Sequence, residues 1–456
     1  MPPGEKPRPP LPPGPYLVVG LARSGSAAAR LLAARGEQVL GTDSGHPDEA
    51  RRLADVGVEV VLDVPGTELL DGVRTVVKSP GVPNAAPVIA AARRRGLAVI
   101  GELELAWRAT PNRFCAVTGT NGKTTTVELI AGIYRTAGEP VAVAGNVGTP
   151  LASLPGEVAA DATVVCECSS FQLEDSESFS PECGVLLNLA PDHLDRHPSS
   201  EEYLAAKLRI FANQGNDDVA VYNGDEPQLA DRDLGGCARR VRFCNGADPG
   251  CEVSLAEGTV FVEGEPLLEA EELRLRGPHN LQNAMAAAAA ALSMELERDA
   301  VREGLRSFAG VPHRLERVAE IGGVEFYNDS KATNVSATVA ALASFGEGVH
   351  TILGGEPKGE SFAPLVEPVR RSCAACYLTG EAAGLLSAAL EPTGVPLRLC
   401  EHLGDALRQA AAAAVPGEVV LLSPACASFD AFRDFEQRGE RFRELVARLA
   451  GDEGRG

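Results

Sequence analysis

The sequence predicts an α/β protein with three domains, a Rossmann-like domain at each end of the chain and a mostly parallel sheet in the centre. Its 456 residues suggest about three domains at roughly 150 residues each. Strand-like and helix-like runs alternate in three separate stretches, which indicates parallel sheets with crossover helices. Several strand-like runs end in glycine or a small polar residue, and parallel sheets bind ligands at that edge.

The domain boundaries follow from composition and from breaks between the stretches. Residues 1–15 contain eight prolines and no apolar core of a signal peptide, so we expect a disordered proline-rich leader. The first stretch predicts an N-terminal domain over 16–101. The other two predict a central domain over 102–310 and a C-terminal domain over 311–456.

Composition excludes several classes of protein. Hydrophobic residues make up 45% and charged residues 23%, as in ordinary globular proteins. The formal net charge of −21 disfavours binding to nucleic acid or to an anionic membrane. An alanine-rich run near 284–292 is much shorter than the roughly 20 residues of a membrane span. We therefore expect a cytoplasmic protein with no nucleic-acid or membrane partner.

The eleven cysteines show no regular spacing, and we expect reduced thiols. Cys373 and Cys376 form a lone CxxC with no second pair of ligands nearby in the sequence. Core packing is the favoured interpretation of this pair over zinc binding or redox chemistry.

A glycine-rich turn, Gly20-Leu-Ala-Arg-Ser-Gly25, joins the first strand-like run to a helix-like run. It resembles a dinucleotide-binding GxGxxG, and Asp43 ends the next strand, but Ala22 replaces the middle glycine. Three interpretations stay open: a nicotinamide dinucleotide site, a site for another nucleotide diphosphate, or a structural turn. The turn Ser79-Pro80-Gly81 follows another strand-like run, and we expect it at the same edge of the sheet.

The strongest motif lies between a strand-like run, 114–118, and a helix-like run, 124–136. It reads Thr118-Gly119-Thr120-Asn121-Gly122-Lys123-Thr124-Thr125. Backbone N–H groups of such a loop and the following helix N-terminus bind phosphates. We expect Lys123 to neutralise phosphate oxygens and the Thr124 hydroxyl to bind Mg²⁺.

Three polar positions in the central domain need an explanation. Glu167 interrupts an apolar strand, and a buried carboxylate there needs a metal or a cationic partner; both interpretations remain. The segment 188–197 contains Asp192, His193, Asp195 and His197, which suits a metal or substrate site and a solvated turn equally well. Lys207 lies in an amphipathic run, where spacing alone favours an ammonium that reaches solvent.

The C-terminal stretch carries polar residues after three strand-like runs. They are the segments 328–334, 354–358 and 423–430, which include lysines on neighbouring loops. Lysines and a serine-rich helix start would suit a small molecule with two carboxylates. The alternative is that these polar residues bind no ligand and only face solvent.

These motifs together resemble the Mur ligase family, the ATP-dependent amino-acid-adding enzymes of peptidoglycan synthesis, from about Tyr16 to about Leu449. The resemblance is carried by the segments TGTNGKTT (118–125), AGNVG, ECSSFQLE (167–174), PDHLDRH (191–197), KLRIF, HNLQN (279–283), PHR (312–314), DSKATN, GGEPKG and SPACASFDAFRDFEQRG (423–439). DSKATN and SPACASFD are similar to the D-glutamate-adding branch of the family. Members that add another amino acid and the related folylpolyglutamate synthases remain the alternatives.

The resemblance implies roles for individual residues. The catalytic residues would be Lys123, Glu167, His193 and Lys207. The ATP-binding residues would be Gly119, Thr120, Asn121, Gly122, Lys123, Thr124, Thr125, Asn280, Asn283, Arg314, Asp329 and Lys331. The residues for the UDP-linked substrate would be Ser24, Asp43, Ser79, Pro80, Gly81, Asn146, Ser169 and His193. D-Glutamate would bind Thr333, Lys358, Ser428 and Phe435. The metal would bind Thr124, Glu167, His193 and Lys207.

The resemblance also implies the cofactors and the organisation of the chain. ATP and Mg²⁺ would be the cofactors, and Lys207 would be carbamylated, which turns an ammonium into an anionic oxygen ligand. The substrates would be UDP-N-acetylmuramoyl-L-alanine and D-glutamate, and the protein would be a monomer. The N-terminal domain would bind the UDP part, the central domain would be a P-loop-type ATPase domain, and the C-terminal domain would bind the amino acid.

Overall fold

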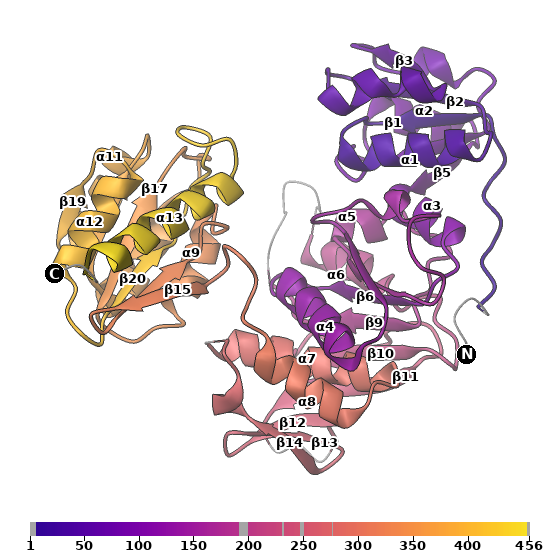
Figure 1. Cartoon of the computed structure of the whole chain (residues 1–456). Helices are drawn as coiled ribbons and strands as arrows, with labels where there is room; N and C mark the ends of the chain where they lie inside the picture. The colour runs from indigo at the N-terminus through magenta and orange to yellow at the C-terminus, as the bar shows by residue number, and fades with distance from the viewer. Residues whose placement is uncertain (1–5, 191–198, 230–231, 247–249, 276, 454–456) are drawn as a thin grey trace. The chain divides into compact units, whose positions relative to one another are not determined.

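The computed structural model describes residues 6–190, 199–229, 232–246, 250–275 and 277–453. The chain forms two compact units (Figure 1). The first comprises Met1–Leu273 with His279–Phe308, and the second comprises Arg274–Pro278 with Ala309–Gly456. The first unit contains two sheets and the second contains one. The predicted α/β class with mostly parallel sheets is confirmed.

The first sheet has five parallel strands in the order β3-β2-β1-β4-β5. Its strands are β1 (Tyr16–Val19), β2 (Val39–Asp43), β3 (Glu59–Leu62), β4 (Thr75–Lys78) and β5 (Ala98–Gly101), with helices α1 (Arg23–Ala34) and α2 (Pro87–Arg94). The turn between β1 and α1 requires its last glycine, because a Cβ on Gly25 would lie 1.7 Å from the Gly20 carbonyl oxygen. The turn therefore brings the start of α1 tightly against the end of β1.

The second sheet has nine strands in the order β14-β13-β12-β11-β10-β9-β6-β8-β7. The strands are β6 (Phe114–Thr118), β7 (Val141–Gly145), β8 (Thr163–Glu167), β9 (Cys183–Leu186), β10 (Val219–Asn223), β11 (Arg239–Asn245), β12 (Val253–Ala256), β13 (Thr259–Val262) and β14 (Glu265–Glu269). Among the strand pairs that the structure describes in this sheet, β12–β13 and β13–β14 are antiparallel and the others are parallel. Strand β6 therefore lies between two parallel neighbours, β8 and β9, and its carboxyl end meets theirs.

Helices pack on this sheet and extend the unit. They are α3 (Glu102–Ala109), α4 (Lys123–Ala137), α5 (Ser170–Leu173), α6 (Ser200–Leu208), α7 (Pro278–Ser293) and α8 (Arg298–Ser307). Helix α4 buries the apolar face that its sequence spacing predicts, including Val127, Ile130 and Ile133. Gly304 of α8 lets the two helices approach closely, because a Cβ there would lie 2.7 Å from the Ile133 Cα.

Residues 6–15 differ from the disorder expected of the leader. Lys6 Nζ lies 2.6 Å from the Asp218 carboxylate, and the Arg8 guanidinium lies 4.3 Å from the centroid of the Trp107 ring. The Pro13 carbonyl oxygen accepts a hydrogen bond from the Thr75 hydroxyl. These residues form an arm between the first and second sheets (Figure 1), because prolines still offer carbonyl acceptors and the two cations find partners.

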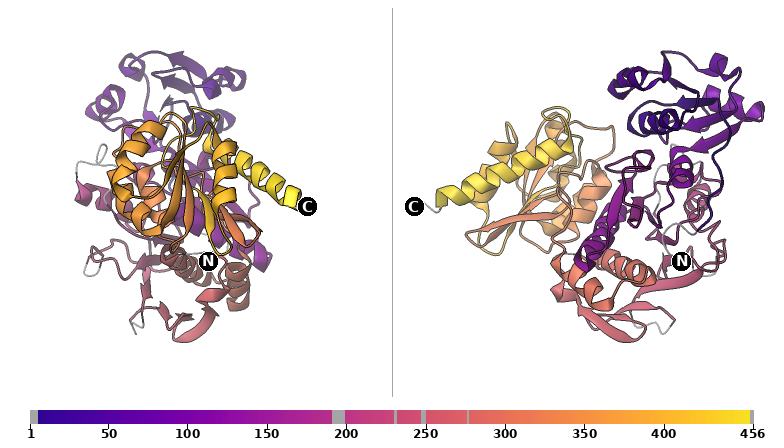
Figure 2. Two further views of the ribbon diagram at one scale, coloured as in Figure 1. Left: turned by 90° about the vertical axis from the view of Figure 1, so that its left-hand side faces the viewer. Right: turned by 45° about the vertical axis from the view of Figure 1, so that its right-hand side comes forward.

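The second unit is built on a six-stranded sheet in the order β15-β16-β20-β17-β18-β19. Its strands are β15 (Glu316–Ile321), β16 (Val324–Asn328), β17 (Val349–Gly354), β18 (Cys373–Thr379), β19 (Leu397–Leu399) and β20 (Val419–Leu422). Its helices are α9 (Val335–Leu342), α10 (Val366–Ser372), α11 (Ala383–Leu390), α12 (Leu403–Ala413) and α13 (Phe435–Glu453). Helices cover both faces of this sheet (Figure 2). One apolar core lies beneath α9, α10 and α11, and another lies beneath α12 and α13.

The cysteines depart from the expectation at one place. Cys244 and Cys251 form a disulfide, and the other nine cysteines are free. Cys376 is buried in the apolar core of the second unit, as core packing predicts. Among the described residues, no group of His, Cys, Asp and Glu is arranged to hold a metal, and no helix is long and apolar enough to cross a bilayer.

Candidate active site

The loop 118–125 joins the carboxyl end of β6 to the first turn of α4. Gly119 and Gly122 have φ angles of 154° and 84°, which other residues rarely adopt. Lys123 is the first residue of α4, and its Nζ donates to the carbonyl oxygens of Gly119 and Thr120 at 2.9 Å each. The lysine thus folds back over the loop that the sequence predicts as a phosphate site.

Glu167 ends β8, directly beside the carboxyl end of β6, and is 4% exposed. Its Oε2 accepts a hydrogen bond from the Thr124 hydroxyl at 2.7 Å, and its Oε1 accepts one from the Asn146 amide at 2.9 Å. A Cβ on Gly145 would lie 2.3 Å from the Glu167 carbonyl oxygen, so only glycine allows Asn146 this position. Three residues that are distant in the sequence therefore meet at one point: Thr124, Asn146 and Glu167.

A hydroxyl, a carboxylate and an amide offer the hard oxygen ligands that Mg²⁺ prefers. Thr124 itself belongs to the loop 118–125, whose N–H groups and lysine suit phosphate oxygens. The donor set therefore fits a magnesium ion bound together with a nucleotide phosphate.

Lys207 lies in α6 and is 1% exposed. Its Nζ donates to the Gly119 carbonyl oxygen at 2.8 Å and lies 4.4 Å from the centroid of the Tyr203 ring. An ammonium that reaches solvent is incompatible with this burial, so that interpretation of the sequence spacing is wrong. The fold instead brings Lys207 to the underside of the phosphate loop.

Ser169 caps the short helix α5. The Gln172 N–H donates to the Ser169 hydroxyl at 3.2 Å, and the Ser169 N–H donates to the Gln172 side chain at 3.0 Å. This capping box fixes the chain that follows Glu167, and it also gives the Ser169 hydroxyl a structural role.

Two asparagines of α7 lie at the phosphate loop. Asn283 Nδ2 donates to Asn280 Oδ1 at 3.2 Å, and both residues are buried. A Cβ on Gly122 would lie 2.2 Å from Asn283 Oδ1, so the amide contacts the loop directly. These predicted ATP residues therefore adjoin Lys123 within the first unit.

The segment after β9 adds one residue to which sequence reasoning gave no role of its own. Asn188 Oδ1 accepts a hydrogen bond from the Asn121 N–H at 2.9 Å, and its Nδ2 donates to the Asn121 carbonyl oxygen at 3.1 Å. The sequence signal for Asn188 was that it is the first polar residue after a buried strand. Asp192, His193, Asp195 and His197 lie outside the described residues.

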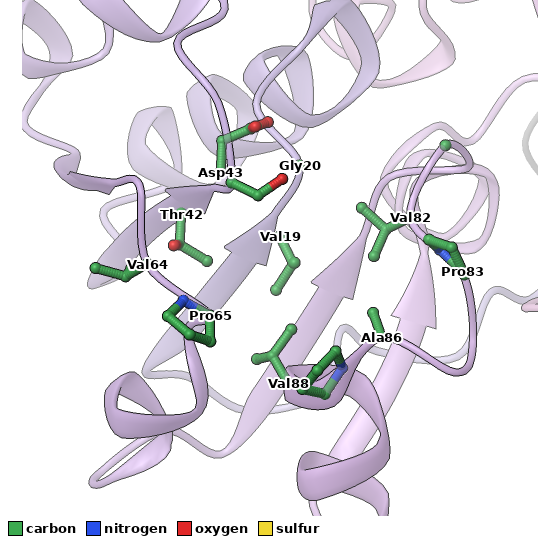
Figure 3. Close-up of a pocket in the computed structure, with 13 residues that line it drawn as sticks. Val19, Gly20, Thr42, Asp43, Val64, Pro65, Val82, Pro83, Ala86 and Val88 are labelled. Carbon is green, nitrogen blue, oxygen red and sulfur yellow. The ribbon is translucent and has the colours of Figure 1, made fainter.

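A cavity of about 270 Å³ opens at the carboxyl ends of β1, β2 and β4 (Figure 3). Of the predicted residues for the UDP-linked substrate, Asp43 and Gly81 line it, and Ser79 is buried nearby at the end of β4. The Asp43 carboxylate accepts hydrogen bonds from the Leu21 N–H at 2.7 Å and the Gly45 N–H at 2.8 Å. Pro80 follows Ser79, and Ser24 is half-buried in the first turn of α1.

The second unit holds a buried carboxylate at the carboxyl end of β16. Asp329 is 4% exposed, and its Oδ2 accepts a hydrogen bond from the Ser423 hydroxyl at 2.8 Å. Its Oδ1 accepts one from the Leu315 N–H at 3.1 Å. Burial raises the pKa of Asp329 to about 7, and these hydrogen bonds and the Arg314 charge oppose that rise.

The predicted D-glutamate residues lie on three loops of this unit. Lys358 Nζ donates to the Thr333 hydroxyl at 3.3 Å. Phe435 begins α13, with its ring 6.4 Å from the His313 ring and 5.8 Å from Lys331 Nζ. Ser428 is buried on the loop after β20.

A buried arginine joins these three loops, and sequence reasoning gave it no role. Arg438 donates to the carbonyl oxygens of Ser330 at 2.9 Å, Ala427 at 3.1 Å and Cys426 at 3.2 Å. Its Nη1 lies 3.5 Å from the Gly354 carbonyl oxygen. Burial lowers the pKa of Arg438 to about 10. Its hydrogen bonds thus go mainly to backbone carbonyls of the three loops.

Sequence comparison identifies relatives of this chain. Three family models match the chain: "Mur ligase MurD-like, N-terminal domain" over 15–101, "Mur ligase middle domain" over 117–291 and "Mur ligase, glutamate ligase domain" over 313–426. The chain is 42% identical over 443 residues to the UDP-N-acetylmuramoylalanine--D-glutamate ligase of Pelotomaculum thermopropionicum, covering 95% of this chain and 97% of the relative. It is also 42% identical over 437 residues to the enzyme of the same name from Solibacter usitatus, covering 94% and 97%.

Solved structures are similar in fold. UDP-N-acetylmuramate-alanine ligase MurC from Thermotoga maritima matches with a TM-score of 0.60 at 21% identity, over 95% of this chain and 99% of that chain. MurF from Acinetobacter baumannii matches with a TM-score of 0.58 at 17% identity, over 84% and 86%. At these identities the likeness concerns the fold alone.

Proposed function

Because the chain belongs to the Mur ligase family, we propose that it is an ATP-dependent ligase that joins D-glutamate to UDP-N-acetylmuramoyl-L-alanine. The name that its relatives at about 40% identity share supports this substrate pair. The observation that carries the chemistry is the contact of Thr124 with Glu167 beside the loop 118–125. That contact supplies a metal and phosphate site at the edge where parallel sheets bind ligands.

In the proposed first step, the free carboxylate of the UDP-linked substrate attacks the γ-phosphorus of ATP. The bond from that phosphorus to the β–γ bridging oxygen breaks, which gives an acyl phosphate and ADP. Lys123 and the N–H groups of the loop stabilise the negative charge on the transferring group. Mg²⁺, held by Thr124, Glu167 and His193, would neutralise phosphate charge when bound.

In the second step, the amine of D-glutamate attacks the acyl carbon. The tetrahedral intermediate loses inorganic phosphate, the amine nitrogen loses a proton, and an amide remains. Thr333, Lys358, Ser428 and Phe435 would hold D-glutamate, and the contact between Lys358 and Thr333 supports a binding point for one of its two carboxylates.

The remaining predicted residues complete the proposal. ATP would also contact Asn280, Asn283, Arg314, Asp329 and Lys331. The UDP part would occupy the cavity at Asp43 and Gly81, beside Ser24, Ser79 and Pro80. Asn146, Ser169 and His193 would meet the muramoyl part. The hydrogen bond between Asn146 and Glu167 supports this arrangement, since it brings an amide to the metal-binding carboxylate.

Lys207 is proposed to carry a carbamate. Its neutral amine would add to CO₂, forming an N–C bond and releasing one proton, and the product is an anionic oxygen ligand. The burial of Lys207 supports this, because its Nζ binds the Gly119 carbonyl oxygen of the phosphate loop, and a buried anionic ligand there would need a cation such as Mg²⁺ beside it.

Phosphate release tests the function. Purified protein would be mixed with ATP, Mg²⁺ and UDP-N-acetylmuramoyl-L-alanine, and D-glutamate, L-glutamate or meso-diaminopimelate would be added singly. We expect release that depends on D-glutamate alone. Release with another amino acid would contradict the proposed specificity, and release with none of them would contradict the ligase assignment.

A further inference from the structure

A buried ion pair joins the loop after β4 to the end of α5. Lys78, the last residue of β4, is fully buried, and its Nζ lies 2.6 Å from Asp175 Oδ2 and 3.6 Å from Glu174 Oε1. The same Nζ donates to the Val82 carbonyl oxygen at 2.9 Å. Lys78 therefore binds its own loop and the chain after α5 at once.

The loop is held to the same segment at a second point. Asn84 Nδ2 donates to Glu174 Oε1 at 2.9 Å, and Arg93 Nη2 donates to Asn84 Oδ1 at 2.9 Å. Arg93 Nη2 also lies 3.5 Å from Asp175 Oδ1. The loop 79–84 is thus tied at its start through Lys78 and at its end through Asn84.

The backbone of Asp175 also docks on the first sheet. The Gly101 N–H, at the end of β5, donates to the Asp175 carbonyl oxygen at 3.3 Å. A Cβ on Gly101 would lie 3.0 Å from the Asp175 Cβ, so glycine permits this close approach. The chain after α5 therefore meets the carboxyl ends of both β4 and β5.

The two sides of this ion pair belong to different parts of the proposed site. On one side, Gly81, Val82 and Pro83 line the cavity at the carboxyl ends of the first sheet. On the other side, Asp175 follows Glu167 by eight residues, through the capped helix α5. The ion pair is thus a direct link between the loop at the cavity and the segment that carries the metal-site carboxylate.

Stability alone does not explain such a pair. Removing an ammonium and a carboxylate from water costs about as much as their attraction returns, so an apolar pair of similar size is often equally stable. Consistent with that cost, burial raises the pKa of Asp175, and the Lys78 charge opposes the rise. The ion pair instead fixes a geometry. A single nitrogen of Lys78 binds both Asp175 and the Val82 carbonyl oxygen, and it therefore holds the loop at one distance from the chain after α5.

We propose that Lys78 and Asp175 are positioning residues that hold the loop 79–83 at a fixed position relative to Glu167. The free carboxylate of the UDP-linked substrate then reaches the γ-phosphate of ATP. This inference rests on the proposed function. Neither residue touches the reacting atoms, and the effect passes through the loop. A displacement of an ångström at such a site lowers the rate strongly.

The test uses the double variant Lys78→Met/Asp175→Leu in the full chain. It removes both charges together, so it avoids the unpaired buried charge that either single variant would leave and that could prevent folding. The matched control is Arg95→Gln/Asp71→Asn, which removes an exposed ion pair of the same domain. Three quantities are measured for each protein: the melting temperature, the dissociation constant of UDP, and the steady-state constants for all three substrates.

For the double variant we expect kcat/KM for UDP-N-acetylmuramoyl-L-alanine to fall about tenfold or more. The melting temperature and the KM for ATP should stay close to the wild-type values, because the variant leaves the phosphate loop 118–125 unchanged. The dissociation constant of UDP should change less than this kcat/KM, because Asp43 and the strand ends that line the rest of the cavity are unchanged. The control should match the wild type throughout.

Two results would overturn the inference. A double variant with wild-type kcat/KM for the UDP-linked substrate would show that the ion pair positions nothing. A fall in melting temperature with equal losses for all three substrates would show a structural role alone. Failure of the proposed function gives a different result, since the wild-type protein would then release no phosphate in response to D-glutamate.

Discussion

At the scale of single residues, the proposed chemistry depends on Glu167. Both of its carboxylate oxygens are engaged, one by Thr124 and the other by Asn146, at the point where β8 meets the phosphate loop. A metal ion bound here would share the carboxylate with these two donors. The negative charge of Glu167, rather than its volume, is then what the reaction needs.

We therefore expect Glu167→Gln to lower kcat at least about 100-fold while the melting temperature changes little. The variant keeps the size of the side chain and loses its charge. Phosphate release and thermal unfolding measure the two effects. Glu128→Gln, an acidic residue on α4 that pairs with Arg135, is the control and should keep full activity. Full activity of Glu167→Gln would contradict the metal-site assignment.

Lys207 gives a second prediction at this scale. Lys207→Ala should be nearly inactive, about 100-fold or more below the wild type, because the carbamate oxygens would be missing from the metal site. Formate or acetate, added at millimolar concentrations, should restore part of the activity by replacing the carboxylate. Activity assays with and without these anions provide the measurement. Normal activity without them would contradict the carbamate.

The raised pKa of Asp329 predicts a dependence of stability on pH. Its folded-state pKa of about 7 lies above the ordinary value of 3.8, so the folded protein binds an extra proton in between. Stability from this group is therefore lost as the pH rises from about 4 to about 7, by on the order of 4 kcal/mol in total, and does not change further above that range.

Hydrogen exchange of amides in β16 and β20, compared at pH 5 and pH 8, measures this dependence within the second unit. Wild-type protection should fall as the pH rises, after correction for the intrinsic exchange rate. Asp329→Asn should show a smaller fall. Glu444→Gln, on the exposed face of α13, should behave like the wild type. An equal fall in Asp329→Asn would show that another group carries the effect.

At the scale of elements, the contacts of the arm 6–15 predict a role separate from catalysis. Its contacts lie at the starts of β4, β9 and β10, through Thr75, Glu182 and Asp218, whereas the proposed sites lie at the carboxyl ends of strands. Arg8, whose side chain is 8% exposed, is the anchor of the arm and stacks over Trp107. The arm should therefore contribute to stability and leave the reaction unchanged.

Arg8→Ala should lower the free energy of unfolding by about 1–3 kcal/mol, because it leaves Trp107 uncovered and Glu182 without its cation. Thermal unfolding measures this, and kcat/KM should stay within about twofold of the wild type. The control is Arg94→Ala, an exposed arginine on α2. Unchanged stability of Arg8→Ala would show that the arm contacts contribute nothing.

The strand–turn–helix units could be predicted from the sequence, since glycine positions and apolar spacing are local signals. The turn at Gly25 and the loop before Lys123 are examples, because each needs glycine where the helix meets the strand. The arm could not be predicted, because prolines give no periodic pattern and the partners of Pro13 and Lys6 lie 62 and 212 residues away in the sequence. The burial of Lys207 likewise depends on the loop 118–125. Its contact there, Gly119, lies 88 residues earlier in the sequence.

At the scale of the whole molecule, all three sheets carry their proposed sites in the same way. The cavity at Asp43, the phosphate loop at Lys123 and the carboxylate of Asp329 each follow the carboxyl end of a parallel strand. The chain has a net charge of −21 and must still bind anionic substrates. The proposed sites therefore predict that a few placed cations such as Lys123 and Lys358, helix N-termini and a bound metal would supply the positive charge.

The most direct measurement of the central claim is the transfer of oxygen between substrates. UDP-N-acetylmuramoyl-L-alanine with ¹⁸O in its free carboxylate would be converted in the presence of ATP, Mg²⁺ and D-glutamate. Mass spectrometry of the released phosphate should find one ¹⁸O atom per turnover, because the attacking carboxylate oxygen leaves with the phosphate when the amide forms. Released phosphate without ¹⁸O would contradict activation of the substrate through an acyl phosphate.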